Sequence, residues 1–372
     1  AKDIPPVLDI ESCLDFVRPR LQRCGLSHVL CKPNPHISDY PARFLVIDSK
    51  APLPILRLVD QKEVKSPYIA LSHCWGNKEG IIETTRAGLI NVTHTHTHLP
   101  KSFRDTAFIA QALDIHHLWI DSLCIIQDDE QDWAQESVKM ADVYSAAILT
   151  IAITGSVNPS GGCLFPRRQH LDKVDDPVLC TGIASRVERL NLPPEVRMRY
   201  ERVCHQRMEG QHTSWEEVDT QISPLLTRAW AFQEKILSPR MIHFHGEEMI
   251  WECNEEHACE CGYEPLGGHD PTRTSSIVAR AVESGRREEI WQLWADLVVK
   301  YILLDITFEK DRLPALAGLG KYLSRILDCT YMAGLWKEDF GRQLLWNRDY
   351  LGRNPSPSHR AQQVPTWTWA SV

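Results

Sequence analysis

Two short polar segments place an acid, an imidazole, thiols and an indole at the carboxyl ends of predicted β-strands. The first is Ser-His-Cys-Trp-Gly at residues 72–76, and the second is Asp-Ser-Leu-Cys at residues 121–124. Ligands of parallel sheets bind outside the carboxyl ends of the strands. We therefore expect one site at that edge of the sheet, formed by His73, Cys74, Trp75, Asp121, Ser122 and Cys124.

The candidate catalytic residues of this site are His73, Asp121 and Glu136. Asp132 and Glu136 come one helical turn later, and the Glu136 carboxylate can point back toward the same edge. The candidate ligand-binding residues are Trp75, Cys74, Ser122 and Cys124, with the indole offering a stacking face to a planar ring. The alternative is that the cysteines and His73 are core residues and that Asp121 caps a turn. The spacing alone leaves both interpretations open.

Cysteine and histidine also cluster in two other places. Cys253, His257, Cys259 and Cys261 offer four soft ligands close together, and a structural zinc site needs four. A second group, Cys24, His28 and Cys31, has three ligands and needs a fourth from elsewhere. The alternative for both groups is buried thiols beside surface histidines. Zinc is therefore a candidate cofactor, and the first group is the favoured site.

The segments that would position these groups alternate between strand and helix. Apolar runs at residues 68–73, 117–121 and 147–153 predict three strands. Helical patterns occupy residues 99–113 and the segment that follows Asp128. This β-α-β-α-β order predicts an α/β fold whose parallel sheet is flanked by helices. The residues expected in its core are Ala70, Leu71, Leu118, Ile120, Leu149 and Ile151.

We divide the rest of the chain around this core. Residues 1–65 form an N-terminal segment, and residues 66–240 form the core, with an insertion at about 156–222. Residues 241–372 begin with a predicted β-hairpin and continue as a mixed, mainly helical region. The last segment, from residue 364, alternates like a strand and then stops. We therefore expect the protein to continue beyond Val372.

Composition excludes several classes of protein. Lys and Arg total 41 against 49 Asp and Glu, and this acidic balance argues against nucleic-acid binding. No apolar run approaches the roughly 20 residues of a membrane span, and no secretory signal opens the chain. We therefore expect a cytoplasmic protein with reduced cysteines and no membrane contact. A small-molecule ligand, a protein partner and self-association all remain candidate interactions.

Several motifs resemble a known family. Residues 68–76, 99–105, 118–127 with Asp132 and Glu136, and 228–234 resemble successive blocks of the fungal heterokaryon-incompatibility (HET) domain. Residues 311–315, 333–336, 345–346 and 365–371 resemble segments that follow it. Arg228 precedes Ala229 where the family often has glycine, and the insertion before Ser223 is less typical.

The resemblance implies a role in fungal non-self recognition that leads to cell death. It also implies a core similar to Toll/interleukin-receptor (TIR) domains, some of which cleave NAD with a glutamate on a helix. Glu136 is the residue that corresponds by position, and a carboxylate there can stabilise the ribosyl centre as nicotinamide leaves. HET-like chains also occur in biosynthetic clusters, so a cyclase or pericyclase with an aromatic-lined pocket is the alternative. Whether the chain is an enzyme stays open at this point.

Overall fold

The structure is a computed structural model of the chain. It describes residues 4–5, 7–32, 40–48, 53–61, 66–76, 81–89, 93–94, 98–167, 223–246, 248–262, 274–346 and 364–371. Most of the predicted insertion, from residue 168 to residue 222, lies outside the described residues. Residues 95–97 of the His-Thr-His-Thr-His segment at 94–98 also lie outside the described residues.

One mixed sheet runs through the described part of the chain, in the order β4-β2-β1-β5-β3-β6-β7-β8-β9. Its strands are β1 (Arg43–Ile47), β2 (Leu56–Asp60), β3 (Ile69–Ser72), β4 (Thr93–His94), β5 (His117–Trp119), β6 (Leu149–Ala152), β7 (Arg240–Phe244), β8 (Met249–Cys253) and β9 (His257–Cys259). The four central strands, β5, β3, β6 and β7, are parallel to their neighbours within this group. The strands on both flanks pair antiparallel.

The prediction of a parallel sheet is therefore right for the centre and wrong for the flanks. β1 and β2 form one antiparallel pair, and β7, β8 and β9 form consecutive antiparallel pairs. Short connections permit only antiparallel pairing, because a parallel pair needs a long crossover. The expected hairpin that begins at residue 241 is confirmed as β7 and β8. The sheet continues across the sequence boundaries placed near residues 65 and 240.

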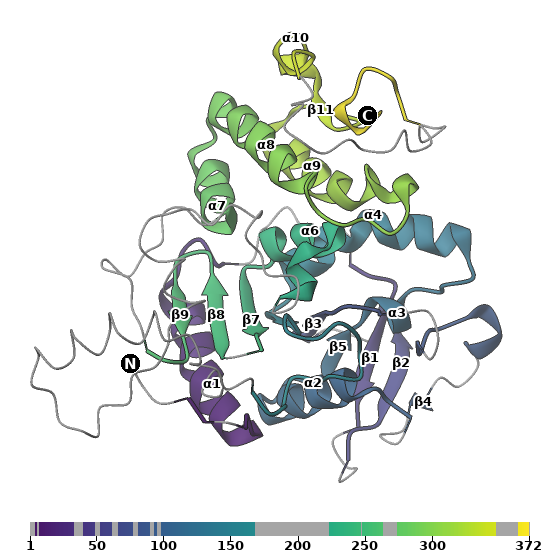
Figure 1. Ribbon diagram of the computed structural model, residues 1–372, viewed down its shortest axis with the longest axis vertical. Helices are drawn as coiled ribbons and strands as arrows, with labels where there is room; N and C mark the ends of the chain where they lie inside the picture. Colours follow the sequence, from purple (N-terminus) through teal and green to yellow (C-terminus); the bar gives the residue numbers. More distant parts are fainter. Residues whose placement is uncertain are drawn as a thin grey trace, which may run out of the picture.

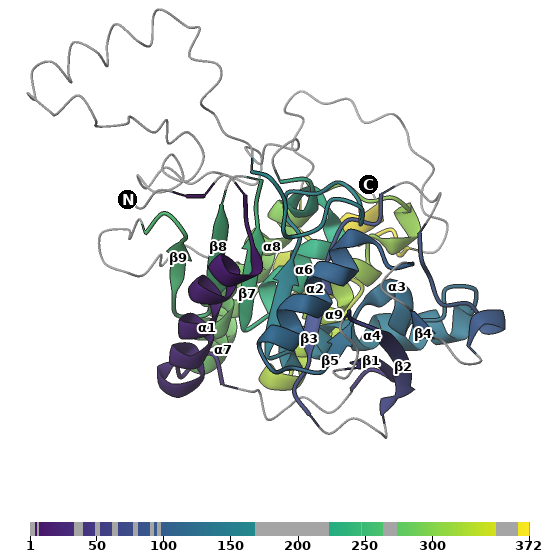
Figure 2. The ribbon, with the colours of Figure 1, turned by 90° about the horizontal axis from the view of Figure 1, so that it is seen from below.

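Helices cover both faces of this sheet. The helices nearest the sheet are α1 (Ile10–Ser27), α2 (Lys101–Ala112), α4 (Glu130–Ala146) and α6 (Ala229–Leu237). Figures 1 and 2 show α1 and α2 on one face and α4 and α6 on the other. The chain passes from β3 through α2 to β5, and then through α4 to β6 on the other side of β3. Right-handed crossovers that run in opposite directions place their helices on opposite faces.

A further helical layer comes from the C-terminal region, as expected. Its main helices are α7 (Thr274–Ser284), α8 (Arg287–Tyr301) and α9 (Pro314–Leu327). α9 packs on both α4 and α6, and Arg325 forms an ion pair with Asp142 of α4. Figure 1 shows this layer above α6, on the side away from α1 and α2. No helix in the described residues has the length and apolar character that crossing a bilayer requires.

The core expected from the sequence is confirmed. Ala70 and Leu71 of β3, Leu118 of β5, and Leu149 and Ile151 of β6 are at most 1% exposed. Ile120 is also fully buried, but β5 ends one residue before it. The predicted strand stops early because Asp121 begins a short helix, α3 (Asp121–Cys124), whose Cys124 N–H donates to the Ile120 carbonyl at 2.7 Å.

The last described segment is a turn with a 3₁₀ helix at Trp369–Ser371, so the expectation of a strand there is wrong. Tryptophan packing explains its alternating pattern. The indole N–H groups of Trp294 and Trp369 both donate to the Gly334 carbonyl, at 2.8 and 3.1 Å. The ring of Trp369 also lies 6.0 Å from that of Tyr301 on α8. Aromatic burial against α8 therefore fixes this segment, and no strand pairing is needed.

Gly155 allows the end of β6 to approach the turn between β7 and β8. Its N–H donates to the Phe244 carbonyl at 2.9 Å, and a Cβ atom at this position would lie 2.6 Å from the Gly246 nitrogen. The Phe244 carbonyl and the Gly246 nitrogen belong to the backbone, so neither can move as a flexible side chain would. We expect Gly155→Ala to lower the free energy of unfolding by about 1–3 kcal/mol, because it overpacks a rigid contact.

Gly341→Ala is the matched control, because a Cβ atom there meets no atom within 4 Å. Its free energy of unfolding should be unchanged or slightly higher than that of the wild type. Urea unfolding of both variants checks the expectation. Equal stability of Gly155→Ala and the wild type would show that the two turns are further apart than described.

Candidate functional site

Asp121 is the centre of a polar cluster at the carboxyl ends of β3 and β5. Its Oδ2 accepts a hydrogen bond from the Trp75 indole N–H at 2.7 Å, and its Oδ1 accepts one from the Ser122 backbone N–H at 2.8 Å. The Asp121 side chain is 17% exposed, and Trp75 is partly exposed as well. The carboxylate therefore holds the indole in place while keeping contact with solvent.

His73 lies next to Asp121 and is buried. Its Nδ1 is 3.8 Å from Asp121 Oδ1 and has no hydrogen-bond partner among the described residues. Burial lowers the pKa of His73, the Asp121 charge opposes this effect, and the Arg228 charge adds to it. A neutral imidazole with an unpartnered buried nitrogen is suited to accept or donate a hydrogen bond to a bound molecule.

Glu234 is a second acid in this cluster, and the sequence interpretation missed it. It lies on α6 and is 6% exposed. Burial raises its pKa to about 7, although hydrogen bonds with the Ser72 and Tyr144 side chains lower it, and the Asp121 charge adds to the increase. A carboxyl group with a pKa near neutrality can exchange a proton at physiological pH, and such groups concentrate at functional sites.

Arg228 supplies the positive charge of the cluster. Its charge acts on His73, Cys74 and Glu234, and it hydrogen-bonds the Cys74 side chain. The residues that we call the Asp121 cluster are His73, Trp75, Asp121, Arg228 and Glu234. Arg228 and Glu234 both belong to the Arg-Ala-Trp-Ala-Phe-Gln-Glu block, which was noted in the sequence for its resemblance alone. That block was the available signal for both residues.

The other candidate ligand-binding residues lie deeper. Burial raises the pKa of Cys74 to about 11 and that of Cys124 to about 12, so both are neutral thiols at pH 7. Cys124 is fully buried, and its carbonyl accepts a hydrogen bond from Arg43 Nε at 2.8 Å. Ser122 is also fully buried, but its hydroxyl has no hydrogen-bond partner among the described residues. Cys124 thus fits the alternative of a core residue, whereas Ser122 retains an unused polar atom.

Glu136 does not join the Asp121 cluster through any of its described hydrogen bonds. Its Oε2 accepts from the Ala42 backbone N–H at 2.9 Å, and its Oε1 accepts from Lys139 Nζ at 2.7 Å. The side chain is 2% exposed. The helix therefore turns this carboxylate toward the segment that enters β1. Both oxygens already have donors, which favours a positioning role over the predicted catalytic one.

Other parts of the family-like blocks position the cluster. Gly76 follows Trp75 with φ of +72°, and a Cβ atom there would lie 2.6 Å from Asn158 Cβ. Asp105 Oδ2 accepts hydrogen bonds from the Cys163 and Leu164 backbone N–H groups at 2.8 and 3.0 Å. These contacts fix the loop after β6 against the loop after β3 and the start of α2. They explain Gly76 and Asp105 by packing alone.

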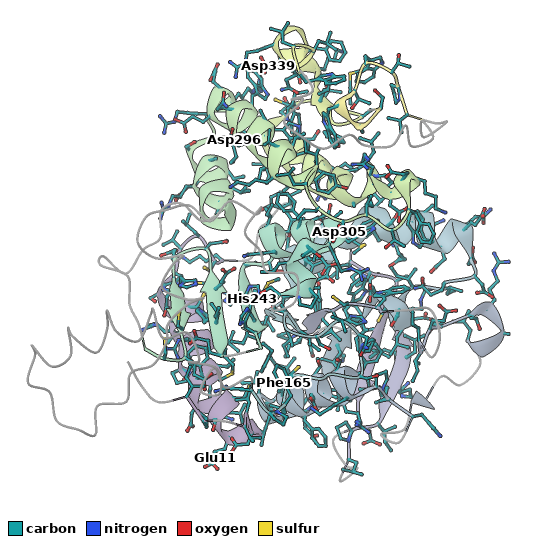
Figure 3. All side chains as sticks on the ribbon, in the orientation of Figure 1. Glu11, Phe165, His243, Asp296, Asp305 and Asp339 are labelled. Carbon is teal, nitrogen blue, oxygen red and sulfur yellow. The ribbon has the colours of Figure 1, made fainter. Side chains whose placement is uncertain are left out.

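The start of α6 is held by the C-terminal region. The Asp305 N–H donates to the Thr227 carbonyl at 2.7 Å, and the Ala229 N–H donates to the Asp305 carbonyl at 2.9 Å. Figure 3 labels Asp305 where the C-terminal layer meets α6. Gln233 is fully buried, and its Oε1 accepts the Leu319 N–H of α9 at 3.0 Å. Neighbouring residues of α6 thus have different partners: Gln233 contacts α9, and Glu234 contacts Ser72 at the end of β3.

The structure divides the predicted metal ligands of residues 253–261 between two groups. Cys253 lies with Cys24, His28 and Cys31, whereas Cys259 and Cys261 lie with Glu248, and His257 belongs to neither described group. The antiparallel pairing of β9 with β8 is the reason, because it sets Cys259 opposite Ile250. That register carries Cys259 back along β8, away from Cys253 at its end. Both groups could hold a metal ion.

Comparison with known proteins relates the sequence of this region to a family. The family model described as heterokaryon incompatibility protein (HET) matches residues 68–234. The chain is also similar to "Heterokaryon incompatibility protein 6, OR allele" of Neurospora crassa, with 24% identity over 203 residues. That match covers 49% of this chain and 29% of the relative, so it spans less than a third of the relative's length. No solved structure matches the chain.

The raised pKa of Glu234 makes stability depend on pH. Its pKa is about 7 in the folded protein and 4.5 as the ordinary value, so the folded state keeps the proton while the unfolded chain loses it. The protonated Glu234 side chain therefore stabilises the folded state fully below pH 4.5, and this contribution falls as the pH rises to about 7. Over this pH range the free energy of unfolding of the wild type should fall by up to roughly 3 kcal/mol relative to that of Glu234→Gln.

Urea unfolding of both proteins across this pH range gives the difference directly. The comparison with Glu234→Gln removes the contribution of His73, whose lowered pKa acts in the opposite direction. A difference that stays constant with pH would mean that the carboxyl group titrates normally.

Proposed function

Because this chain is a HET-domain protein, we propose that it acts in fungal non-self recognition leading to cell death, with the Asp121 cluster as its functional site. The family match over residues 68–234 includes all five residues of the cluster. The matched relative is named for heterokaryon incompatibility, which supports the same role here. A cytoplasmic location and a core of TIR type remain predictions from the sequence.

One observation carries the assignment of the site. Three separate blocks of the sequence meet here, and they contribute His73 with Trp75, Asp121, and Glu234. The pKa of the Glu234 carboxyl group is raised to about 7. Burying an acid is costly, so a fold that served only for scaffolding would gain by replacing it with an apolar side chain. His73, and Ser122 next to Asp121, also keep polar atoms that have no hydrogen-bond partner among the described residues. These features support a site that binds a small polar molecule.

NAD is the candidate ligand that the TIR-like resemblance implies. Cleavage of its glycosidic bond develops positive charge on the ribose, which a nearby carboxylate stabilises. Asp121 is better placed for this than Glu136, because it is partly exposed and lies beside the Trp75 ring. We therefore assign the charge-stabilising role to Asp121, with Glu234 as the group that exchanges protons.

A tailoring enzyme of secondary metabolism has weaker support. That alternative depended on tryptophans lining an apolar pocket. Trp294, Trp336 and Trp369 are instead at most 8% exposed, and the rings of Trp294 and Trp336 lie 5.4 Å apart. These side chains pack against one another in the C-terminal layer, where they stabilise the fold.

Expression in a fungal host tests the proposal. Asp121→Asn keeps the shape of the side chain and removes its charge, so we expect cell death to fall by about 10²-fold, as for loss of an electrostatic catalytic group. Asp296→Asn is the matched control, because this exposed residue lies on α8 away from the cluster (Figure 3). The control should kill as the wild type does. Both variants need a melting temperature near that of the wild type.

The same cultures decide between ligands. If the site cleaves NAD, cellular NAD should fall with the wild type and with Asp296→Asn, but not with Asp121→Asn. Death without loss of NAD would refute NAD cleavage and leave the signalling role. Full activity of a well-folded Asp121→Asn variant would refute the assignment of the site. Glu136→Gln adds a contrast, since a positioning residue should reduce activity only as far as it reduces stability.

A further inference from the structure

Three cysteines and one histidine meet where the end of α1 touches the sheet. The Sγ atoms of Cys24, Cys31 and Cys253 and a ring nitrogen of His28 all lie within 4.8 Å of one another. His28 Nδ1 is 3.3 Å from Cys253 Sγ and 4.0 Å from Cys31 Sγ. Four ligands around a tetrahedral zinc ion lie about 3.5–3.8 Å apart, given its bond lengths to sulfur and nitrogen. The group therefore needs only small shifts to enclose such an ion.

Local structure accounts for three of the four ligands. Cys24 and His28 are one helical turn apart, so they lie on the same face at the end of α1. The His28 N–H still donates to the Cys24 carbonyl at 3.2 Å, which keeps this spacing. The turn that follows brings Cys31 back to the same point. Cys253 comes from the end of β8, far away in the sequence.

Hydrogen bonds dock this turn on the sheet independently of the four ligands. Asn254 Nδ2 donates to the Leu30 carbonyl at 2.8 Å, and the Leu30 N–H donates to Glu255 Oε1 at 2.6 Å. Arg240 Nη2 donates to the Cys31 carbonyl at 2.7 Å. Figures 1 and 2 show α1 beside β8 and β9. The ligands are thus held in place by the surrounding chain.

Two of the three sulfurs accept hydrogen bonds, one from an arginine side chain and one from a backbone N–H. Arg240 is 8% exposed, its Nε lies 3.1 Å from Cys24 Sγ, and it takes part in none of the ion pairs of the described chain. The Glu256 N–H donates to Cys253 Sγ at 3.2 Å. A buried guanidinium needs a negative partner, and a thiolate would supply one.

We propose that Cys24, His28, Cys31 and Cys253 bind one structural zinc ion that fastens α1 to the edge of the sheet. Three thiolates and a neutral imidazole around Zn²⁺ leave a net charge of about −1, which the Arg240 side chain balances. His28 would bind through Nδ1, and its Nε2 faces Glu256 Oε2 at 4.0 Å, a carboxylate placed behind the ligand as in many zinc sites. Binding releases the remaining thiol protons to solvent.

The set is closed, which favours a structural role. The three cysteines are at most 2% exposed and the His28 side chain is 14% exposed, so no open position faces a substrate. The neighbouring group of Glu248, Cys259 and Cys261 has three ligands among the described residues. Its Glu248 Oε2 also accepts the Cys261 N–H at 3.2 Å. The group of Cys24, His28, Cys31 and Cys253 therefore fits a zinc ion better than the group of Glu248, Cys259 and Cys261 does.

Metal analysis of the protein, purified under reducing conditions without chelator, is the first test. We expect about one zinc ion per chain in the wild type. Cys24→Ser and Cys31→Ser should each retain less than about a tenth of it, because a three-ligand site lacks closure. Cys259→Ser and Cys261→Ser are the matched controls and should keep the metal. Loss in these controls with retention in Cys24→Ser would show that the ligands are those of residues 253–261.

Cobalt substitution covers the case in which the ligand variants do not fold. After chelation, the wild-type chain should bind one Co²⁺ ion and develop the strong visible absorption of tetrahedral thiolate coordination, and zinc should then displace the cobalt. Its melting temperature should fall on chelation and recover with zinc. A wild type that contains no zinc and gives no such spectrum after reduction overturns the proposal. A disulfide between two of these cysteines in the freshly isolated protein overturns it as well.

Discussion

The parallel pairing of β5, β3, β6 and β7 is the constraint on which the site depends. It brings the carboxyl ends of strands from distant parts of the chain to one edge of the sheet. The connections after β3 and β5 leave for opposite faces, which makes this the point where ligands bind in open α/β sheets. His73 and Trp75 follow β3, and Asp121 follows β5. Their meeting is therefore a consequence of topology.

Glu234 reaches the same edge from a helix, and the C-terminal region determines how that helix sits. Asp305 fixes the first turn of α6 through two backbone hydrogen bonds, and Gln233 ties the helix to α9 through Leu319. Without these contacts, burial of the Glu234 carboxyl group would be hard to maintain, because the cost of desolvating an acid opposes it. The layer of helices and tryptophans that follows the family-like region thus supports the site at its edge. The acid–base character of the site depends on packing outside it.

Much of this arrangement could be predicted from the sequence, because local patterns determine it. The apolar runs predicted the central strands. The carboxyl ends of parallel strands meet at one edge of a sheet, which predicted that His73, Trp75 and Asp121 lie together. The hydrogen bonds of Glu136 could not be predicted, since helical spacing fixes the turn on which a carboxylate lies but not the backbone donor, here Ala42, that it binds. The grouping of Cys253 with Cys24 depends on how α1 docks on β8. No local spacing contains that information.

The central claim is that separate blocks of the chain form one electrostatically coupled site. Infrared titration of the Glu234 carboxyl band, assigned by its absence from Glu234→Gln, measures this coupling directly. The account predicts a midpoint near pH 7 in the wild type, with burial as the main cause and the Asp121 charge as a contributor. In Asp121→Asn the midpoint should move to lower pH, because that charge is gone. A wild-type midpoint near the ordinary value of 4.5, or one that Asp121→Asn does not move, would contradict the account.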